Sequence, residues 1–316
     1  MTSAPSSSAP PSTGIGPRRL VRKTLRVAAT GLARALHWAG LERSASWRMA
    51  VFDAAPAGSV LVSTRGPETY LVSSGDRAIA RELYVNGQFD FEKLQKVMRL
   101  LGPGFQPRLL LDIGANIGCI CIAAVKRGLF ERAMAFEPEP YNFSLLAANI
   151  HLNGLASRIT PRNLALGARD GEQLVFELSK DNYGDHRISM GAQDGQFDEA
   201  CRERITVPSE SLDSQIEGDW PGCLIWMDTQ GFEGYVLQGA ARSLRERPPL
   251  VVEFWPYGMQ RSGSYEALKH AVLQAGYTHF HDLELDEGPV PASEAGFDAV
   301  WQRLGTSGRF TDLLIQ

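Results

Sequence analysis

The fold is decided by one stretch of the sequence, Leu109-Leu110-Leu111-Asp112-Ile113-Gly114-Ala115-Asn116-Ile117-Gly118. Its first half is a continuous apolar run that ends in an acid, which is typical of a strand buried on both faces. Its second half is a glycine-rich turn that leads into a predicted helix through residue 126. Further strands are predicted over 133–137 and 159–166, with a helix over 141–153 between them. Strand and helix signals therefore alternate, which predicts an α/β fold with a mostly parallel sheet.

The alternation is interrupted once and then resumes. Residues 172–178, 180–190 and 204–208 predict antiparallel strands and loops. Strands then follow over 223–228, 250–255 and 278–283, with helices over 234–244 and 264–275 between them. A last β run over 310–315 has no helix signal before it, so we expect it to enter the sheet as a hairpin partner.

The N-terminal third predicts three parts ahead of a main domain over 105–316. Residues 1–17 are rich in Ser, Pro and Ala and predict a disordered tail. Residues 18–48 hold a basic amphipathic segment. Its apolar stripe over 18–40 recurs at helical spacing and consists of Val21, Leu25, Ala28, Leu32, Leu36 and Ala39. Residues 49–104 predict a small subdomain with strands over 59–64 and 69–73 and helices over 78–86 and 91–101. The basic helix could lie on an anionic membrane, pack on its own domain, or belong to a transit peptide.

Composition and charge exclude several classes of protein. The chain has 316 residues, 44% hydrophobic and 22% charged, as in a soluble globular protein. Residues 17–48 carry a net charge of +7 within a total of −4, so residues 49–316 carry −11. An acidic body argues against nucleic acid as a partner. No apolar run is long enough for a transmembrane helix, and four scattered cysteines predict buried thiols in a reducing compartment such as the cytoplasm.

The glycine-rich turn predicts a nucleoside site. The dinucleotide pattern Gly-x-Gly-x-x-Gly is absent, and so is the Gly-Lys-Ser/Thr of triphosphate-binding loops. Glu137 ends the second strand, where an acid can accept the hydroxyls of a ribose. S-adenosylmethionine fits these features, with its amino-acid tail near Asp112 and the turn and its ribose on Glu137.

A series of ordered motifs resembles the FkbM-type family of S-adenosylmethionine-dependent methyltransferases over about residues 109–281. The resemblance implies a Rossmann-like class I methyltransferase fold, with a mostly parallel seven-stranded sheet and an antiparallel last strand. It also implies a methyl acceptor hydroxyl on a sugar, glycolipid or polyketide. The motifs are Asp112-Ile113-Gly114-Ala115-Asn116-Ile117-Gly118, Phe136-Glu137-Pro138, Asn149…Asn153-Gly154, Ala165-Leu166-Gly167…Gly171-Glu172, Ser211-Leu212-Asp213 and Asp228…Gly231-Phe232-Glu233…Leu237…Gly239-Ala240.

The resemblance assigns cofactor residues one by one. Gly114, Asn116 and Gly118 would border the methionine part of S-adenosylmethionine, and Glu137 would hold its ribose. The end of the third strand, from Asn163 to Ala165, would lie near the adenine.

The chain departs from the family pattern at the fourth strand, where Lys-x-Asp-x-Glu-Gly-x-Glu is usual. Trp226 replaces the lysine and Gln230 replaces the first glutamate. Gln230 cannot take a proton near neutral pH, so a general base must come from elsewhere. The candidates are Asp228 and Glu253 at neighbouring strand ends, Glu233 in the same motif as Asp228, and His186 in a polar loop, with an ordinary pKa near 6.5.

We therefore expect a methyltransferase that transfers a methyl group to a hydroxyl. An NAD-dependent oxidoreductase is disfavoured by the missing dinucleotide pattern, and a non-catalytic binding module stays open because of Trp226 and Gln230. Trp255-Pro256-Tyr257 is expected to line the acceptor side. The sequence shows no metal-binding cluster.

Overall fold

The computed structural model describes residues 21–22, 25–31, 34, 40, 44–189, 191, 195–218 and 221–316. The chain divides into two compact units, residues 1–51 and 52–316. In the first unit, residues 21–22, 25–31 and 34 are helical, and α2 (Ala45–Ala54) begins there. The disordered tail predicted for residues 1–17, and Leu32, Leu36 and Ala39 of the predicted apolar stripe, lie outside the described residues. None of the described helices is long and apolar enough to cross a membrane.

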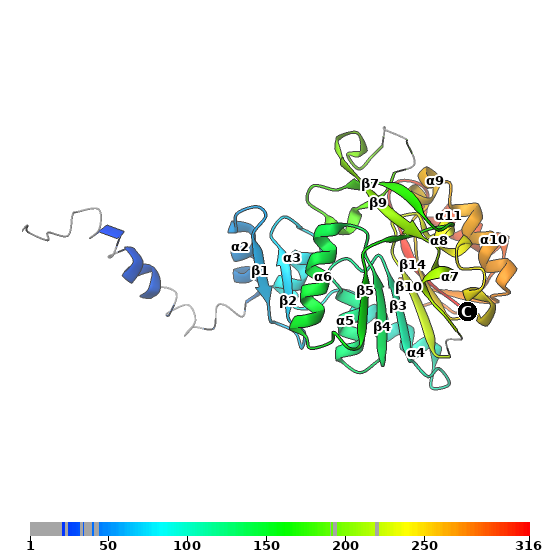
Figure 1. The fold of residues 1–316 in the computed structure, drawn as a ribbon, viewed down its shortest axis with the longest axis horizontal. Helices are drawn as coiled ribbons and strands as arrows, with labels where there is room; N and C mark the ends of the chain where they lie inside the picture. The colour runs from blue at the N-terminus through cyan, green and yellow to red at the C-terminus, as the bar shows by residue number, and fades with distance from the viewer. Residues whose placement is uncertain are drawn as a thin grey trace, which may run out of the picture. The chain divides into compact units, whose positions relative to one another are not determined.

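A mostly parallel sheet forms the centre of the second unit. The stretch that decides the fold supplies β3, which lies between β10 and β4, as the alternating pattern predicts. The pairs β11–β14, β14–β12 and β12–β13 are antiparallel, and the other pairs of this sheet are parallel. Figure 1 shows β10, β3, β4 and β5 side by side. In spatial order the strands are β13 (Val290–Pro291), β12 (His279–Asp282), β14 (Thr311–Ile315), β11 (Leu250–Phe254), β10 (Cys223–Met227), β3 (Leu109–Ile113), β4 (Arg132–Phe136) and β5 (Ile159–Arg162).

Alternate residues of each strand face two separate cores. On β3, Leu110 packs into one core, whereas Leu109 and Leu111 pack into the other. This alternation follows from the pleat, which turns successive side chains to opposite faces of a sheet. The first core also receives α4 (Phe91–Leu101), α5 (Cys119–Lys126) and α6 (Pro140–Leu152). The second receives α8 (Glu233–Gln238), α10 (Tyr265–Ala275) and α11 (Glu294–Leu304), so the sheet is covered on both faces.

The predicted interruption forms a second, four-stranded sheet. Its order is β6 (Ala165–Leu166), β9 (Glu203–Glu210), β7 (Glu172–Leu178) and β8 (Arg187–Ile188). The prediction of one strand over 159–166 is therefore wrong at its end. Residues 165–166 leave the main sheet and pair with β9 instead. The short α7 (Leu212–Gln215) follows this sheet, and α9 (Pro256–Ser262) follows β11.

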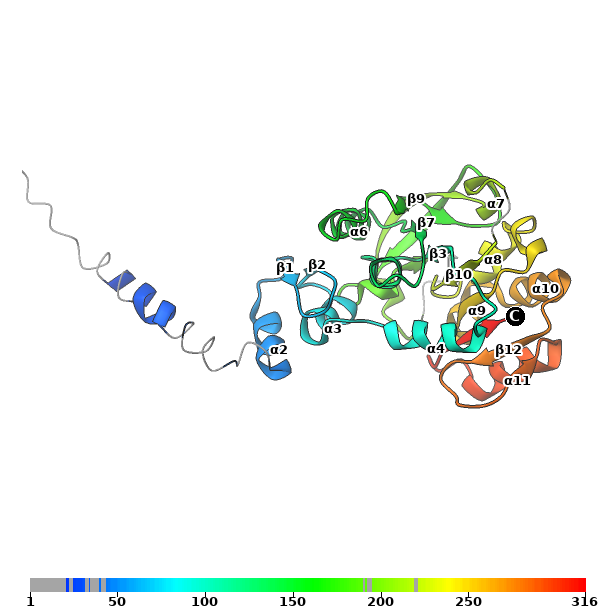
Figure 2. The same ribbon diagram turned by 90° about the horizontal axis from the view of Figure 1, so that it is seen from below.

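Two further expectations are corrected at the C-terminal end. The last strand is preceded by a helix, α11, which the sequence did not predict and which lies beside β12 (Figure 2). Phe297 of α11 stacks on Phe280 of β12. The main sheet has eight strands rather than seven, because the two-residue β13 pairs with β12.

Two side-chain amides at the C-terminal end of α6 join the main domain to the predicted subdomain. Its elements are β1 (Val60–Ser63), β2 (Tyr70–Ser73), α3 (Ile79–Asn86) and α4. Asn149 of α6 accepts from the Leu71 N–H (2.6 Å) and donates to the Leu71 carbonyl. Asn153, one turn later, makes the same pair with Thr69. The two amides thus pair with the free edge of β2, which accounts for the Asn149…Asn153 motif. The boundary of this subdomain at residue 104 remains a prediction.

Candidate active site

The turn after β3 lets two strand ends approach each other closely. Gly114 has φ +84°, and a Cβ atom on it would lie 1.9 Å from the carbonyl oxygen of Asp228. Only glycine fits both requirements. Asn116 follows with φ +50°, and its side chain donates to the carbonyl of Tyr183 (3.1 Å). The turn therefore brings the end of β3, the end of β10 and the Tyr183 loop together.

Glu137 is buried and fixed by the backbone. Its Oε2 accepts from the N–H of Asn116 (2.8 Å) and its Oε1 accepts from the N–H of Glu139 (2.9 Å). Burial raises the pKa of Glu137 to about 8, although the two N–H groups oppose this shift. Each carboxylate oxygen has a second lone pair for a ligand hydroxyl.

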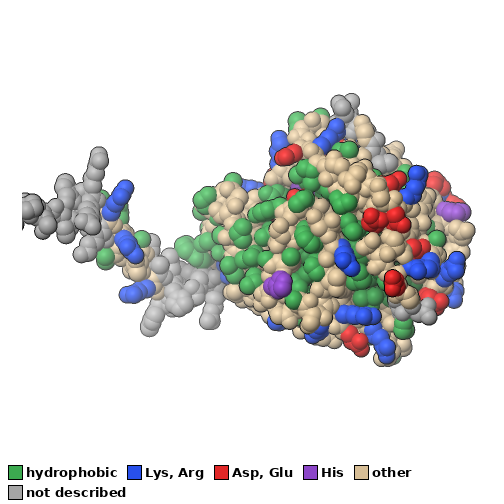
Figure 3. All heavy atoms as spheres, in the orientation of Figure 1, with side chains coloured by type: hydrophobic (Ala, Val, Ile, Leu, Met, Phe, Trp, Pro, Cys, Tyr) green, Lys and Arg blue, Asp and Glu red, His purple; other side chains and the backbone are tan. Residues whose placement is uncertain are grey.

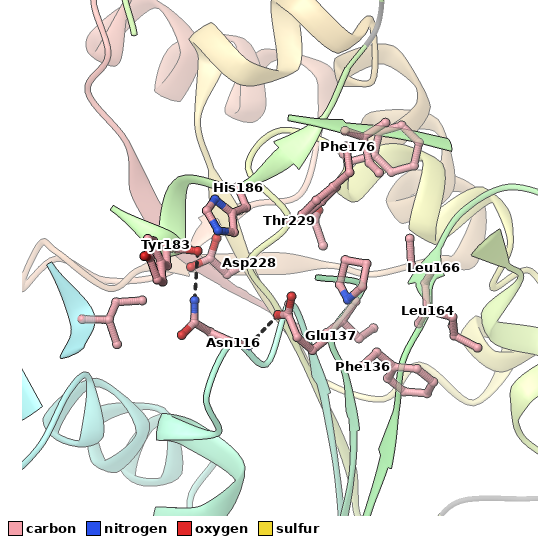
Figure 4. A pocket seen from close by; sticks show the side chains of 18 residues that line it. Asn116, Phe136, Glu137, Leu164, Leu166, Phe176, Tyr183, His186, Asp228 and Thr229 are labelled. Atoms are coloured by element: carbon pink, nitrogen blue, oxygen red, sulfur yellow. Dashed lines mark hydrogen bonds between the residues drawn. The ribbon is translucent and has the colours of Figure 1, made fainter. Parts of the chain in front are cut away.

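These residues line a cavity that we call the glycine-loop cavity, which spans about 610 Å³ with its open mouth included. Its walls differ in polarity (Figure 4): Tyr183, His186 and Asp228 gather at one end, and apolar side chains at the other. A polar end and an apolar end suit a nucleoside with a charged tail. The cavity is lined by Ile79, Ile113, Gly114, Asn116, Phe136, Glu137, Pro138, Leu164, Ala165, Leu166, Phe176, Tyr183, Gly184, His186, Ile188, Asp228, Thr229 and Phe232.

Three of the seven predicted cofactor residues do not line this cavity. Asp112 is buried and accepts from the N–H of Cys121 at the start of α5, and burial raises its pKa to about 6. Gly118 turns into α5 with φ +93°. Asn163 donates to the carbonyls of Glu137 and Pro138 and so holds the loop after β4. The other four, Gly114, Asn116, Glu137 and Ala165, do line it.

A second cavity, which we call the acidic cavity, opens beside the first. It spans about 1280 Å³ with its mouth included. Three residues line both cavities: Ile79, Gly184 and Asp228. Six carboxylates and one lysine line the acidic cavity, together with five aromatic side chains. The charged residues are Asp90, Asp185, Asp228, Glu253, Glu284, Asp312 and Lys93, and the aromatic ones are Phe89, Trp226, Phe197, Trp255 and Phe310.

Gln230 joins Asp228 to Glu253. Its Nε2 donates to Oδ1 of Asp228 (2.7 Å) and to Oε2 of Glu253 (2.9 Å). Its backbone holds φ +56°, which is uncommon for a residue with a side chain. Burial raises the pKa of Asp228 to about 7, and burial together with the charge of Asp228 raises that of Glu253. The pKa of Asp228 lies near neutral pH, so Asp228 can accept a proton there.

The prediction of an ordinary pKa for His186 is wrong. Burial and the nearby Arg202 lower its pKa to about 4. Its Nδ1 accepts from the N–H of Ser179 (2.9 Å), so the proton of the neutral ring sits on Nε2. The ring stacks on Tyr183 at 5.3 Å. His186 therefore lines the glycine-loop cavity as a hydrogen-bond donor.

Of the remaining predicted residues, Trp255 lines a cavity, whereas Tyr257 and Glu233 line neither of the two cavities. Trp255 lines the acidic cavity, but Tyr257 does not, because its hydroxyl donates to Glu199 (2.7 Å). Glu233 is fully buried and accepts from the N–H and hydroxyl of Thr229, so it fixes the turn after β10. Sequence reasoning missed Tyr183 and Lys93, whose positions depend on loops and helices far away in the chain.

Comparison with solved structures finds distant likenesses, among them the following three. Methyltransferase FkbM from Methylobacillus flagellatus KT is 17% identical, with a TM-score of 0.42. The match covers 75% of this chain and 52% of that protein, so this chain spans about half of the length of that protein. TYW2 of M. jannaschii, solved in complex with AdoMet, is 10% identical (TM-score 0.38; 83% and 86% covered). The B. subtilis m1A22 tRNA methyltransferase TrmK is 13% identical (TM-score 0.37; 71% and 64% covered).

Comparison of the sequence with family models identifies the family more specifically than the structural matches do. No curated protein matches the chain. The model of the methyltransferase FkbM domain matches residues 112–287, which is more than half of the chain and includes the glycine-rich turn, Glu137, Asp228 and Glu253. The strand order, with β3 between β10 and β4 and an antiparallel β14, is that of a class I methyltransferase, as the sequence resemblance implies. The chain belongs to the FkbM family of methyltransferases, which use S-adenosylmethionine as the methyl donor.

Proposed function

We propose that the protein transfers a methyl group from S-adenosylmethionine to a hydroxyl of a sugar, glycolipid or polyketide-like acceptor. The observation that carries the proposal is the place of Asp228. It lines both the glycine-loop cavity and the acidic cavity, and it is the charged residue they share. A donor in the first cavity and an acceptor in the second would meet beside this carboxylate.

The residues of the glycine-loop cavity fit the donor. In this proposal Glu137 accepts the ribose hydroxyls, Gly114 and Asn116 border the methionine part, and Ala165 lies near the adenine. Three predicted cofactor residues do not line the cavity and act indirectly, by fixing the backbone of the turn after β3 and of the loop after β4. They are Asp112, Gly118 and Asn163.

The acidic cavity supplies the base. When bound, S-adenosylmethionine supplies the methyl group: the carbon–sulfur bond breaks as the carbon–oxygen bond forms, and S-adenosylhomocysteine keeps the electron pair. Asp228 accepts the proton of the attacking hydroxyl, and Gln230 and Glu253 hold Asp228 in position. His186 is not the base in this mechanism, because its Nδ1 is occupied and its Nε2 carries a proton.

The small subdomain predicted over 49–104 completes the acceptor side of the methyltransferase domain predicted over 105–316. Ile79 lines both cavities, and Phe89, Asp90 and Lys93 line the acidic one. An acceptor would therefore lie between these residues and the ends of β10, β11 and β14. Because the lining carries six carboxylates, it would repel a phosphate backbone, so we propose that nucleic acid is not the acceptor.

Calorimetry tests the proposed donor site. S-adenosylhomocysteine should bind in the micromolar range and NAD should not bind. Glu137→Ala should weaken the binding by about 1–3 kcal/mol, which is the scale for leaving a buried hydrogen-bonding group without its partner. Glu131→Ala, a change of the same kind at an exposed site, serves as the control. Binding of NAD instead, or an unchanged affinity in Glu137→Ala, would contradict the assignment.

We also propose that the protein is cytoplasmic and that its N-terminal segment contacts a membrane surface. Val21, Leu25 and Val27 are each more than half exposed on the described part of the helix. Lys and Arg side chains lie along the same part (Figure 3). Apolar residues beside basic ones suit an anionic membrane surface, where each basic residue contributes about 1 kcal/mol.

Co-sedimentation with anionic vesicles tests this contact. The full chain should sediment at low salt and be released at high salt, since screening weakens the attraction. A full-length variant with Arg22, Arg26 and Arg34 changed to Glu should stay in solution. Equal sedimentation of both proteins would end the membrane proposal.

A further inference from the structure

The charges around the acidic cavity are unequally compensated. Lys93 pairs with Asp312, Asp90 (3.6 Å) and Glu284 (3.4 Å), so one cation serves three acids. Asp185 is compensated separately by two arginines. The carboxylates that line the cavity therefore outnumber the cations that pair with them.

Asp228 and Glu253 are left without a cation. Among the residues that the structure describes, neither forms an ion pair, and both are held by the neutral amide of Gln230 alone. Glu253 is 6% exposed and faces Asp312 on the neighbouring strand. Two ionised carboxylates close together in a largely buried place are costly, so without a cation these groups hold their protons to higher pH, and a positive charge beside them would favour the ionised forms.

The walls of the cavity indicate which kind of cation would join them. No group of three potential metal ligands occurs in the described part of the chain, so the carboxylates are not arranged for a metal ion. The aromatic rings of Trp226, Trp255 and Phe310 line the same cavity. Aromatic faces attract organic cations and also stack on sugar rings.

The two carboxylates also differ in what they face. Asp228 lines both cavities, whereas Glu253 lines only the acidic cavity. Asp228 can therefore face the reacting hydroxyl while Glu253 faces another group of the same acceptor. A cation at Glu253 would also favour the ionised form of Asp228, the form that accepts a proton.

We propose that the acceptor carries a protonated amino group, as an amino sugar does, which binds Glu253 while the hydroxyl to be methylated faces Asp228. This inference rests on the proposed function, because it places the acceptor in the acidic cavity. The ammonium group takes no part in the transfer: the methyl group moves from sulfur to oxygen, and the hydroxyl proton moves to Asp228.

Binding of three simple sugars tests the inference. The full chain is saturated with S-adenosylhomocysteine, and the affinities for glucosamine, glucose and N-acetylglucosamine are measured by saturation-transfer NMR at pH 7.5. Glucosamine should bind at least tenfold more tightly than the other two, because only its amino group is charged. Glu253→Gln should remove this preference and leave binding of S-adenosylhomocysteine unchanged. Glu287→Gln, which removes an exposed negative charge outside the cavity lining, should keep the preference.

The outcomes separate this inference from the proposed function. Equal affinities for the three sugars, no measurable binding of glucosamine, or a preference that survives in Glu253→Gln would each overturn the inference while the donor site stands. Failure of S-adenosylhomocysteine to bind would overturn the proposed function, and this inference with it.

Discussion

Asp228→Asn should make the protein more stable and less active. The substitution keeps the size of the side chain and an oxygen that can accept from Gln230. It removes one of two close carboxylates and the group that we propose as the base. A change that improves the fold and abolishes the reaction marks a residue held for function rather than for stability.

The size of the stabilisation follows from the pKa of Asp228. Burial raises that pKa from 3.8 to about 7 in the folded protein. The folded state therefore keeps a proton that the unfolded chain loses between pH 4 and pH 7, and the free energy of unfolding falls as the pH rises through this window. Three pKa units correspond to about 4 kcal/mol, which is an upper limit because Asp228 is partly exposed to the cavities.

Urea denaturation of both proteins from pH 4 to pH 9 measures this effect. The stability gained by Asp228→Asn should be near zero at pH 4, grow up to pH 7, and stay at about 2–4 kcal/mol above it. Methyl transfer should fall by at least a hundredfold, the scale of losing a general base. A gain that does not change with pH, or a variant less stable than the parent at pH 8, would refute the reasoning.

Three further predictions address the turn, the subdomain and the histidine. Gly114→Ala should disrupt folding or donor binding because its Cβ would overlap a carbonyl oxygen, whereas Gly128→Ala, with nothing within 4 Å and φ +76°, should cost only about 1 kcal/mol in urea denaturation. Asn149→Ala should lower the free energy of unfolding by about 2–4 kcal/mol, since buried backbone groups lose their partners. His186→Gln should keep the midpoint of the pH–rate profile near neutral pH; a midpoint that moves would restore the histidine as base.

The main sheet could be predicted because its signals are local. Residues 109–113 are apolar at every position except one, and a strand buried on both faces needs this pattern. The helix over 91–101 is observed with the same bounds because its apolar residues recur at helical spacing. The helix over 294–304 was missed, although Ser293 caps it by accepting from the N–H of Gly296.

The candidate site could be predicted only in part. Gly114, Glu137 and Asp228 follow strands directly, and Glu253 is the last but one residue of β11. Because parallel strands end at one edge of a sheet, the common location of these residues follows from the sequence. The pKa of His186 did not follow, because burial by the Tyr183 loop and Arg202 depends on tertiary packing. Lys93 lies more than a hundred residues before Asp312, and no local pattern predicts their ion pair.

Gln230 is one of the two departures from the family pattern, with Trp226, that leave a non-catalytic binding module open, and its geometry argues against that alternative. A glutamate there would place a third carboxylate beside Asp228 and Glu253, whereas the amide donates to both. The two acids remain without a cation among the described residues, and an apolar pair of similar volume would be more stable in such a place. A module that only bound a nucleoside would have no physical reason to hold uncompensated acids where its two cavities meet. A methyltransferase has one, because the attacking hydroxyl must lose its proton there.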